Sequence, residues 1–493
     1  MDSARPSALT PFALLALLAL GSVASAQATF TVVGPGRAAD VSPDGAFVVG
    51  TDAGGAFLWS ASGLVSLGQD VAVAVSDDGA VVFGNMTDAS GDSFAGRWTA
   101  GTGWVPVGEL SGNSGSSVSS GYDMSGDGDT ATGLGWNSAS DGAAFLYQSG
   151  STTPLPQVGS GSHRGNAVSG DGRVIGGWDE GPTGARLATL WDASLAQTFP
   201  FVDAAVNPDG VGEVSALSTD GTWAARFASP NTGRTQGAIW SAATGTVYLG
   251  EGPPTGSFFD RGFALGVTDD GGVAVGAWGA PPFNLSGTIW TPGGGLVLFD
   301  DFLAANGATG AAGWDVLSVD AITPDGSTLV GTAAPAGQPF PASWFIATVD
   351  TSLGTNYCTA VPNSTGLAGV MSAMGSDAVA ANNVELRASS LPQGQFGIFV
   401  VSMTQGLTTN IPNNVGNLCL GGTIGRYQDL SQIFSTGASG SGTLAIDLAA
   451  VPMGPVLVAT MPGDTLNFQA WHRDVVGGAA TSNFTDGLEI LFD

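Results

Sequence analysis

Short apolar runs alternate with Gly-rich turns through the first two thirds of the chain, at a spacing typical of β-strands. The pattern is clearest at 75–84, where Val-Ser-Asp-Asp-Gly-Ala-Val-Val-Phe-Gly places an Asp-Gly turn between two apolar segments. Gly accepts a positive φ and Asp tolerates it, so the pair suits a tight turn. The flanking Val residues suit the pleated strands on either side. This segment therefore predicts a β-hairpin.

The hairpin recurs seven times, with its turn aspartate at Asp44, Asp78, Asp127, Asp171, Asp220, Asp270 and Asp325. An aromatic residue follows each turn, at Trp59, Trp98, Tyr147, Trp191, Trp240, Trp290 and Trp344. The separation from aspartate to ring is 15 residues once, 19 once and 20 in the other five repeats. Successive turns lie 34 to 55 residues apart, which brackets the about 40–50 residues of a four-stranded propeller blade.

The repeats predict an all-β fold, a seven-bladed β-propeller in which the aromatic rings pack between blades. The seventh repeat runs 343–350 and then loses the pattern without a fourth strand. The segment 30–34, Phe-Thr-Val-Val-Gly, precedes the first hairpin and has no partner within its own repeat. We expect it to complete the last blade and to close the ring, because an open edge would be exposed to pairing with other chains. The alternative is an open solenoid.

The first repeat, with Ala39-Asp40-Val41-Ser42-Pro43-Asp44-Gly45 followed by Val48-Val49-Gly50 and Ala56-Phe57-Leu58-Trp59, resembles the HAF extracellular repeat of secreted bacterial proteins. It is also similar to the WD40-type blade, although it lacks the Gly-His signature, and only one of the seven repeat aromatics, Trp191, is followed by Asp. The resemblance covers about two thirds of the chain. It implies a blade-like repeat and no catalytic residues.

After a joint at 351–356 the pattern changes, and alternating segments such as 384–388, 444–448 and 488–492 predict half-buried strands. About six to eight strands are expected over 357–493, which favours a β-sandwich. This region resembles an uncharacterised C-terminal module of secreted bacterial proteins, and that resemblance implies no activity.

The first 26 residues have the features of a secretory signal peptide. Arg5 precedes an apolar core over 12–20, and Ala24-Ser25-Ala26 is a small-residue cleavage pattern. The expected organisation is therefore a signal peptide over 1–26, a propeller over 27–350, a linker over 351–356 and a β-sandwich over 357–493. The protein is expected to be secreted, either extracellular or held at the cell surface.

The chain has a net charge of −29, and all twelve of its basic residues are Arg. This charge argues against nucleic acid and against anionic membrane surfaces as partners. No segment is long and apolar enough to predict a membrane-spanning helix. A glycan or a protein remains as the expected ligand.

Cys358 and Cys419 are the only cysteines. Export predicts a disulfide between them, and the alternative is a pair of free thiols serving as metal ligands or nucleophiles. The chain has only two histidines, His163 and His472, and a structural role is expected for both. The acid pairs Asp77-Asp78, Asp269-Asp270 and Asp300-Asp301 could serve a glycosidase, but two of them belong to the repeated turn.

No catalytic residue, cofactor or metal is therefore expected. Calcium at 125–129, Ser-Gly-Asp-Gly-Asp, is kept as an alternative, although this segment lacks the full EF-hand ligand series. The favoured function is a non-catalytic extracellular binding or surface-structural module. The alternatives are a secreted propeller hydrolase or lyase acting on glycans, and a C-terminal module that sorts or attaches the propeller.

Overall fold

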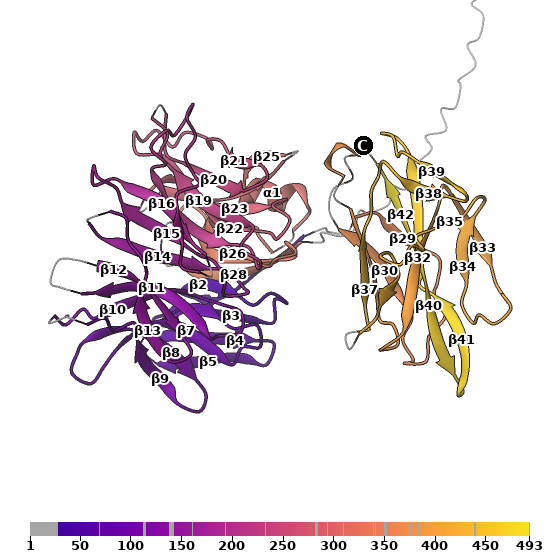
Figure 1. Cartoon of the computed structure of the whole chain (residues 1–493), viewed down its shortest axis with the longest axis horizontal. Helices are drawn as coiled ribbons and strands as arrows, with labels where there is room; N and C mark the ends of the chain where they lie inside the picture. The colour runs from indigo at the N-terminus through magenta and orange to yellow at the C-terminus, as the bar shows by residue number, and fades with distance from the viewer. Residues whose placement is uncertain are drawn as a thin grey trace, which may run out of the picture.

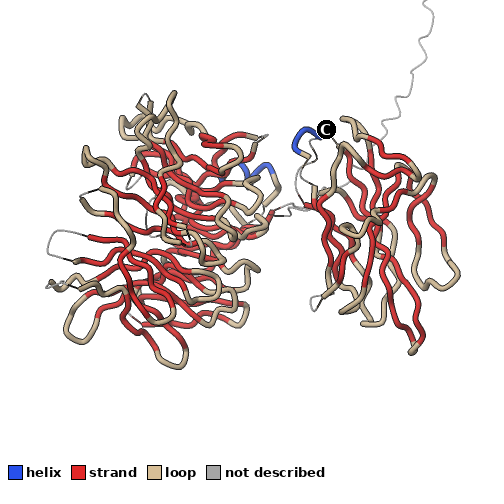
Figure 2. Tube along the Cα trace, in the orientation of Figure 1, coloured by secondary structure: helices blue, strands red, loops and turns tan. Residues whose placement is uncertain are grey.

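The computed structural model describes residues 28–492, apart from short gaps at 69, 112–114, 138–141, 160, 193, 232, 282–283, 293, 309, 339, 341, 350–352, 375–376, 378, 383 and 438–439. The expected signal peptide lies outside these residues. Strands dominate the described chain, which confirms the all-β prediction (Figure 2). The strands form two groups, the first up to residue 349 and the second from residue 355 (Figure 1).

The first group contains seven four-stranded antiparallel sheets among the described residues. We call them blades 1 to 7. Blades 1 to 3 are β2–β5 (Arg37–Val41, Phe47–Asp52, Gly55–Ser60, Gly63–Gly68), β6–β9 (Val71–Val75, Val81–Thr87, Ser93–Thr99, Gly103–Val107) and β10–β13 (Ser119–Met124, Thr130–Trp136, Gly142–Gln148, Ser151–Pro154). Blades 4 to 6 are β14–β17 (His163–Val168, Ile175–Glu180, Arg186–Trp191, Gln197–Thr198), β18–β21 (Gly212–Leu217, Trp223–Ala228, Gln236–Ser241, Gly245–Tyr248) and β22–β25 (Arg261–Val267, Ala274–Ala280, Asn284–Thr291, Gly295–Leu298).

Blade 7 joins the two ends of this group, in the order β1-β28-β27-β26. Its strands are β1 (Ala28–Pro35), β28 (Ser343–Val349), β27 (Thr328–Pro335) and β26 (Trp314–Ile322). Strand β1 pairs antiparallel with β28, from Ala28 opposite Val349 to Pro35 opposite Ser343. The predicted closing strand is confirmed, so this blade has no open outer edge at β28.

One set of hydrogen bonds shapes the repeated turn in all seven blades. In blade 1 the Ser42 hydroxyl donates to Asp44 Oδ1 at 2.7 Å, and the same Oδ1 accepts the Ala46 N–H at 2.9 Å. The Ser42 oxygen in turn accepts the Phe47 N–H at 3.0 Å. The other six turns repeat these three bonds with a Ser or Thr two residues before the aspartate. The following glycine has φ between +68° and +75° in every turn. The Ser/Thr-x-Asp-Gly pattern is therefore explained by local backbone geometry.

The aromatic residues of the third strands pack between neighbouring blades, as predicted. Trp344 of blade 7 is fully buried and its ring lies 5.0 Å from Phe57 and 5.9 Å from Trp59 of blade 1. Trp191 of blade 4 is also fully buried, and its indole N–H donates to the Pro156 carbonyl oxygen at 2.8 Å. A short helix, α1 (Phe299–Ala305), covers the core beside blades 6 and 7.

Arg226 departs from the pattern of the other blades. It is fully buried in β19, where its guanidinium stacks 4.6 Å from the centre of the Phe201 ring. Its Nε and Nη2 atoms have no hydrogen-bond partner among the described residues. Burial lowers the pKa of Arg226 to about 10, so the side chain remains charged at neutral pH.

Replacing Arg226 by Met should stabilise the protein, because an uncompensated buried charge is costly and Met has a similar length without the charge. We expect the free energy of unfolding to rise by about 1–4 kcal/mol. Chemical denaturation of the two proteins measures the difference. A less stable R226M variant would show that the guanidinium gains more from its surroundings than its burial costs.

The second group of strands forms the C-terminal region. Its elements are β29 (Thr355–Tyr357), β30 (Val370–Met374), η1 (Val379–Ala381), β31 (Glu385–Ser389), β32 (Phe396–Ser402), β33 (Thr404–Thr408), β34 (Leu418–Gly421), β35 (Gly425–Arg426), β36 (Phe434–Ser435), β37 (Gly442–Ala445), β38 (Val451–Met453), β39 (Val456–Val458), β40 (Thr465–Val476), β41 (Ala479–Phe484) and β42 (Gly487–Leu491). The larger sheet runs β29-β42-β40-β32-β35, with β36 paired to β32 and β41 to β40, and the smaller runs β30-β31-β37.

Both sheets contribute to a single hydrophobic core. Met371 and Leu386 come from the smaller sheet, and Phe399, Phe468 and Ile490 from the larger one. This two-layer packing around one core is the arrangement of a β-sandwich. The described residues contain fourteen strands here instead of six to eight, and five of these strands have only two or three residues. Such short strands leave no periodic pattern in the sequence.

Candidate functional site: the central channel of the propeller

The first strand of every blade carries a β-bulge at the same place. In blade 1 the register passes from Ala38 opposite Gly50 to Asp40 opposite Val49, so Ala39 has no partner. The bulge residues of blades 1 to 7 are Ala39, Val73, Tyr122, Asn166, Ser215, Leu265 and Asp320. All seven line one cavity of about 220 Å³. The first strands therefore surround a central channel, and the bulge sends one side chain of each blade toward it.

A glycine of the second strand makes room for the bulge. In blade 2 a Cβ atom on Gly84 would lie 1.8 Å from the Val71 carbonyl oxygen, which no side chain could tolerate. Glycines stand at the corresponding position of six blades, at Gly50, Gly84, Gly133, Gly177, Gly276 and Gly331. Arg226 takes this place in blade 5. The glycine that ends the apolar run of six of the seven repeats thus leaves room for the bulge in the channel wall.

Two further rings line the same cavity. The residue three before the turn aspartate is aliphatic in every blade: Val41, Val75, Met124, Val168, Leu217, Val267 and Ile322. The residue directly before each turn aspartate lines the opening of the channel that faces the turns, which we call the mouth. These residues are Pro43, Asp77, Gly126, Gly170, Thr219, Asp269 and Pro324. The channel therefore has a level lined by aliphatic side chains, and Asp77, Thr219 and Asp269 supply polar groups at its mouth.

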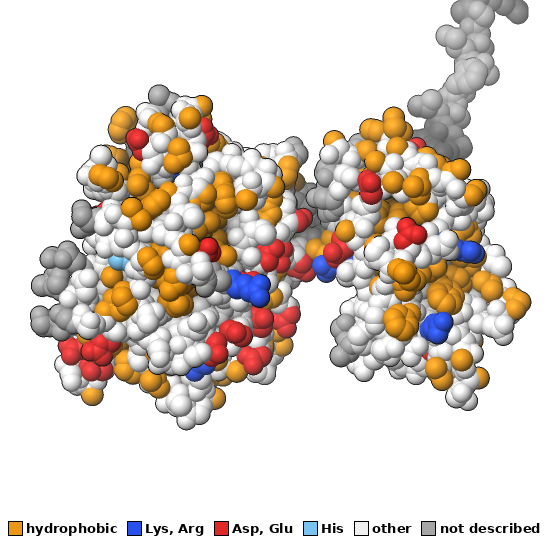
Figure 3. Space-filling model, viewed as in Figure 1, with side chains coloured by type: hydrophobic (Ala, Val, Ile, Leu, Met, Phe, Trp, Pro, Cys, Tyr) orange, Lys and Arg blue, Asp and Glu red, His pale blue; other side chains and the backbone are white. Residues whose placement is uncertain are grey.

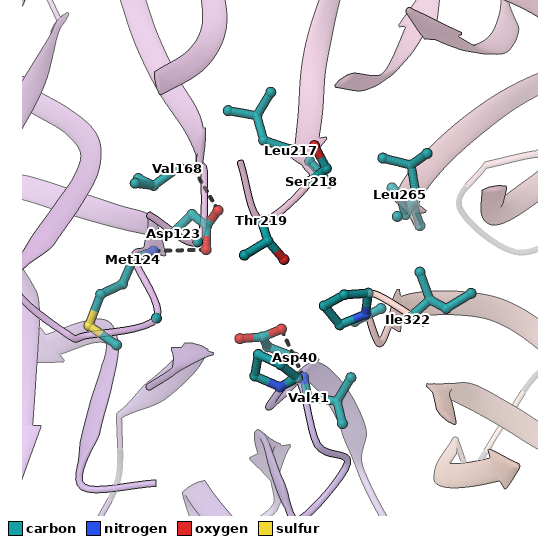
Figure 4. A pocket seen from close by; sticks show the side chains of 18 of the residues that line it. Asp40, Val41, Asp123, Met124, Val168, Leu217, Ser218, Thr219, Leu265 and Ile322 are labelled. Atoms are coloured by element: carbon teal, nitrogen blue, oxygen red, sulfur yellow. Dashed lines mark hydrogen bonds between the residues drawn. The ribbon is translucent and has the colours of Figure 1, made fainter. Parts of the chain in front are cut away.

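Two aspartates of the channel wall link adjacent blades. Asp40 accepts the N–H of Val41 at 2.8 Å and the N–H of Val75, in the next blade, at 2.9 Å. Asp123 repeats this contact between blades 3 and 4, with N–H donors from Met124 at 2.8 Å and Val168 at 2.7 Å. Figure 4 shows both carboxylates at the wall of the same cavity. Each carboxylate therefore links the first strands of two adjacent blades, at the level of the aliphatic residues that line the channel.

Burial raises the pKa of these channel carboxyl groups. The pKa of Asp40 rises to about 6 and that of Asp123 to about 8, where the negative charge of Asp40 adds to the effect of burial. Backbone hydrogen bonds oppose the rise at both residues. The pKa of the bulge residue Asp320 is also raised by burial, to about 6, although Thr332 donates a hydrogen bond to it at 3.0 Å. Burial therefore favours the neutral form of all three channel carboxyl groups.

Replacing Asp123 by Ala should flatten the dependence of stability on pH. The folded-state pKa lies above the ordinary value of 3.8, so the folded protein holds this proton more tightly than the unfolded chain. The resulting stabilisation is complete below about pH 4 and is lost as the pH rises toward 8. Because one pKa unit corresponds to about 1.4 kcal/mol, the loss of stability between pH 5 and pH 9 should shrink by more than about 1 kcal/mol in D123A. Scanning calorimetry at the two pH values measures this change.

Blades 2, 4, 5 and 7 already have alanine at the position of Asp123, at Ala74, Ala167, Ala216 and Ala321. The substitution is therefore compatible with the repeat. Asp129→Ala, which removes an exposed carboxylate from the next turn, is the matched control. Equal pH dependence in D123A and the unaltered protein would show that Asp123 titrates normally.

Arginine and aromatic side chains pack together near the start of β14. The Arg164 guanidinium lies 4.6 Å from the centre of the Tyr122 ring and 2.9 Å from the Glu213 carboxylate. Arg186 also pairs with Glu213, and it stacks 4.3 Å from the Trp178 ring. These contacts join blades 3, 4 and 5, so the cluster has a sufficient structural explanation.

The two histidines do not enter the channel. His163 is buried between blades 3 and 4, with Nε2 3.1 Å from the Leu155 carbonyl oxygen. His472 is buried in β40, with Nδ1 3.1 Å from the Arg473 carbonyl oxygen. Because a carbonyl only accepts, both nitrogens donate. Burial lowers the pKa of both imidazoles.

The acid pairs separate into turn residues and channel residues. Asp78 and Asp270 shape their turns, whereas Asp77 and Asp269 belong to the mouth of the channel. Asp300 lies in α1, and its side chain accepts a hydrogen bond from the backbone N–H of Val316 in β26. At the suggested calcium segment, Asp127 accepts its bonds from Ser125 and Asp129 within the turn. Among the described residues, no group of three or more His, Cys, Asp or Glu side chains is placed to hold a metal ion.

Sequence reasoning missed Asp40, Asp123 and Asp320 as candidate residues. The available signal was their position in the repeat, since Asp40 and Asp123 both lie four residues before the turn aspartate. Seen alone, each is one polar residue in an apolar strand. Only the superposition of the seven repeats shows that they face a common axis.

A disulfide joins Cys358 to Cys419, whose Cα atoms are 6.3 Å apart.

Within the part of the chain that the structure describes, no helix is long and apolar enough to cross a membrane. Acidic side chains form several clusters on the propeller face seen in Figure 3, and few basic ones are visible there.

The seven sheets and their shared axis define a β-propeller protein. No family model matches the chain, and no curated protein matches it either. The resemblance to the HAF repeat and to a C-terminal module of secreted proteins therefore stays a prediction.

Several solved structures are similar to this chain. TolB from Acinetobacter baumannii has 12% identity and a TM-score of 0.34, and the match covers 52% of this chain and 61% of that one. A putative TolB from Agrobacterium tumefaciens has 13% identity and a TM-score of 0.34, over 66% of this chain and 99% of that one. The β-propeller domain of the trilobed protease from Pyrococcus furiosus has 10% identity and a TM-score of 0.36, over 65% of this chain and 95% of that one. This chain thus spans about three fifths of the first of these proteins, and at such values the likeness says nothing about activity.

Proposed function

We propose that this protein is an exported, non-catalytic binding propeller with an accessory β-sandwich. The observation that carries the proposal is the use of its acidic and imidazole groups. All seven turn aspartates shape their own turns, both histidines donate to backbone carbonyls, and Asp40 and Asp123 each accept two backbone N–H groups. Acid–base chemistry needs a group that can reach a substrate, and these side chains are engaged by the fold.

Export is part of the proposal. The sequence pattern of residues 1–26 supports it, and the pairing of Cys358 with Cys419 is compatible with an oxidising compartment. The ligand we propose is a neutral glycan or a protein, because the net charge of −29 disfavours polyanions. Attachment of the propeller by the C-terminal region is kept as an additional role.

Binding arrays test this function. The mature chain, beginning at Gln27, would be applied to glycan and protein arrays with and without calcium. Saturable binding to one ligand class supports the proposal. The absence of binding on every array would contradict it.

A second candidate is a hydrolase or lyase acting on glycans. The observation that favours it is the pair Asp40 and Asp123, two carboxyl groups in one cavity with pKa values raised to about 6 and 8. Turnover of a polysaccharide panel, abolished in D123A, would establish this alternative and overturn the non-catalytic proposal.

A further inference from the structure

A groove between blades 4 and 5 lies outside the central channel. It has a volume of about 510 Å³, within the range of small-molecule sites. Val174, Leu190 and Trp240 supply its apolar surface. Asp192 and Thr198 of blade 4 and Thr244 of blade 5 supply polar groups. Leu190 lies in β16 and Trp240 in β20, two strands in the upper part of the propeller in Figure 1.

The outer strand of blade 4, which borders this groove, is short. Strand β17 has two residues, whereas the fourth strand of every other blade has between four and eight. Among the equivalent rings, Trp191 and Trp344 are fully buried, whereas Trp240 keeps part of its surface exposed. The rings of blades 1 to 3, Trp59, Trp98 and Tyr147, are partly exposed as well. Phe201 contacts the Trp240 ring edge-to-face, with ring centres 5.2 Å apart. The indole is therefore held in place while it remains accessible.

Polar groups next to this indole are fixed as well. Asp192 Oδ1 accepts the N–H of Ser194 at 2.8 Å, the hydroxyl of Ser194 at 2.6 Å and the N–H of Ala196 at 3.0 Å. Asp192 Oδ2 has no hydrogen-bond partner among the described residues and is left as a free acceptor. The groove thus presents an aromatic surface beside a preorganised carboxylate.

The chemistry of the groove selects a class of ligand. A pyranose ring has an apolar C–H face that can pack on an indole, and hydroxyl groups that donate to a carboxylate. Among the described residues, no Arg, Lys or His side chain lines the groove. An anionic sugar would therefore meet the Asp192 charge without a compensating cation. A neutral sugar meets no such repulsion.

We propose that the groove formed by Trp240, Asp192 and their neighbours between blades 4 and 5 is a binding site for a neutral carbohydrate. The inference rests on the proposed binding function and names its site and ligand class. The sugar stacks on Trp240, and its hydroxyl groups donate to Asp192 Oδ2.

Titration calorimetry with the mature chain tests the proposal, using maltohexaose, cellohexaose and xylohexaose as neutral probes and tetragalacturonate as the anionic one. We expect saturable binding of at least one neutral probe and none of tetragalacturonate. Asp192→Asn keeps the side-chain oxygen that fixes the turn but removes the charge, and it should weaken binding at least tenfold. Trp240→Tyr, with the residue that blade 3 has at Tyr147, should weaken it less.

A blocking variant makes the test independent of folding. Ala242 is exposed and lines the groove, so Ala242→Arg should abolish binding by filling the space. Ala61 is exposed in the equivalent turn of blade 1, and Ala61→Arg is the matched control that should bind normally.

Three results would overturn the carbohydrate site. These are no binding of any neutral probe, binding of tetragalacturonate alone, or neutral binding that A242R leaves unchanged. Binding of a protein on the arrays, without sugar binding, would overturn this site and leave the proposed binding function standing.

Discussion

Replacing Phe30 by Ala is expected to destabilise the propeller by about 3–5 kcal/mol, the range for truncating a buried phenylalanine. Phe30 lies in β1, the strand that completes blade 7 from the other end of the chain. Its side chain is 4% exposed, and its ring centre is 4.8 Å from that of Phe345. Loss of this contact weakens the junction that closes the ring. Chemical denaturation measures the change, and limited proteolysis near residues 28–35 shows whether β1 detaches first.

Thr31→Ala provides the control for this prediction. Thr31 is the next residue of the same strand, and its side chain is exposed. The variant should lose less than about 0.5 kcal/mol, as surface substitutions usually do. Equal stability of the two variants would mean that β1 contributes little to the closure of the ring.

Replacing Cys358 and Cys419 together by Ser is expected to destabilise the C-terminal region by about 4 kcal/mol. The two cysteines are 61 residues apart in sequence, and the bond restricts the unfolded chain over that length. Cys419 is also fully buried in β34, so one of the serines must be accommodated in the core. The unfolding transition of the C-terminal region should shift to lower denaturant concentration.

Reduction of the unaltered protein separates the two contributions to this loss. Dithiothreitol should reproduce most of the shift without placing a hydroxyl group in the core. The double variant itself should not respond to the reductant. A protein whose unfolding is the same with and without dithiothreitol would contradict the role given to the disulfide.

The repeated hairpin could be predicted because its determinants are local. Asp44 and Gly45, with Ser42 before them, form a turn whose hydrogen bonds lie within six residues. The closing strand was also predictable, because segment 30–34 and the incomplete seventh repeat each lacked a partner. Each hairpin thus leaves a signal within a few residues, and the closing strand leaves one in two short segments at opposite ends of the propeller.

The channel could not be predicted in the same way. Its wall depends on bulges that shift the register by one residue, and nothing in a sequence such as Ala38-Ala39-Asp40 marks the unpaired position. Arg226 shows a second limit, since a charged residue in a strand suggests an exposed face although it is fully buried. The groove at Trp240 is lined by residues of two blades, such as Leu190 and Trp240, which only the packing of the blades brings together.

The unpaired residues of the first strands have a consequence for how such a protein changes over time. They range from Ala39 to Tyr122 and Asp320, although the strands around them repeat closely. A substitution at any of these positions would alter the lining of the central channel and leave the hydrogen bonds between the strands of each blade intact. The chain thus holds seven separately adjustable positions around one pore, and selection could redirect what enters it without rebuilding the scaffold.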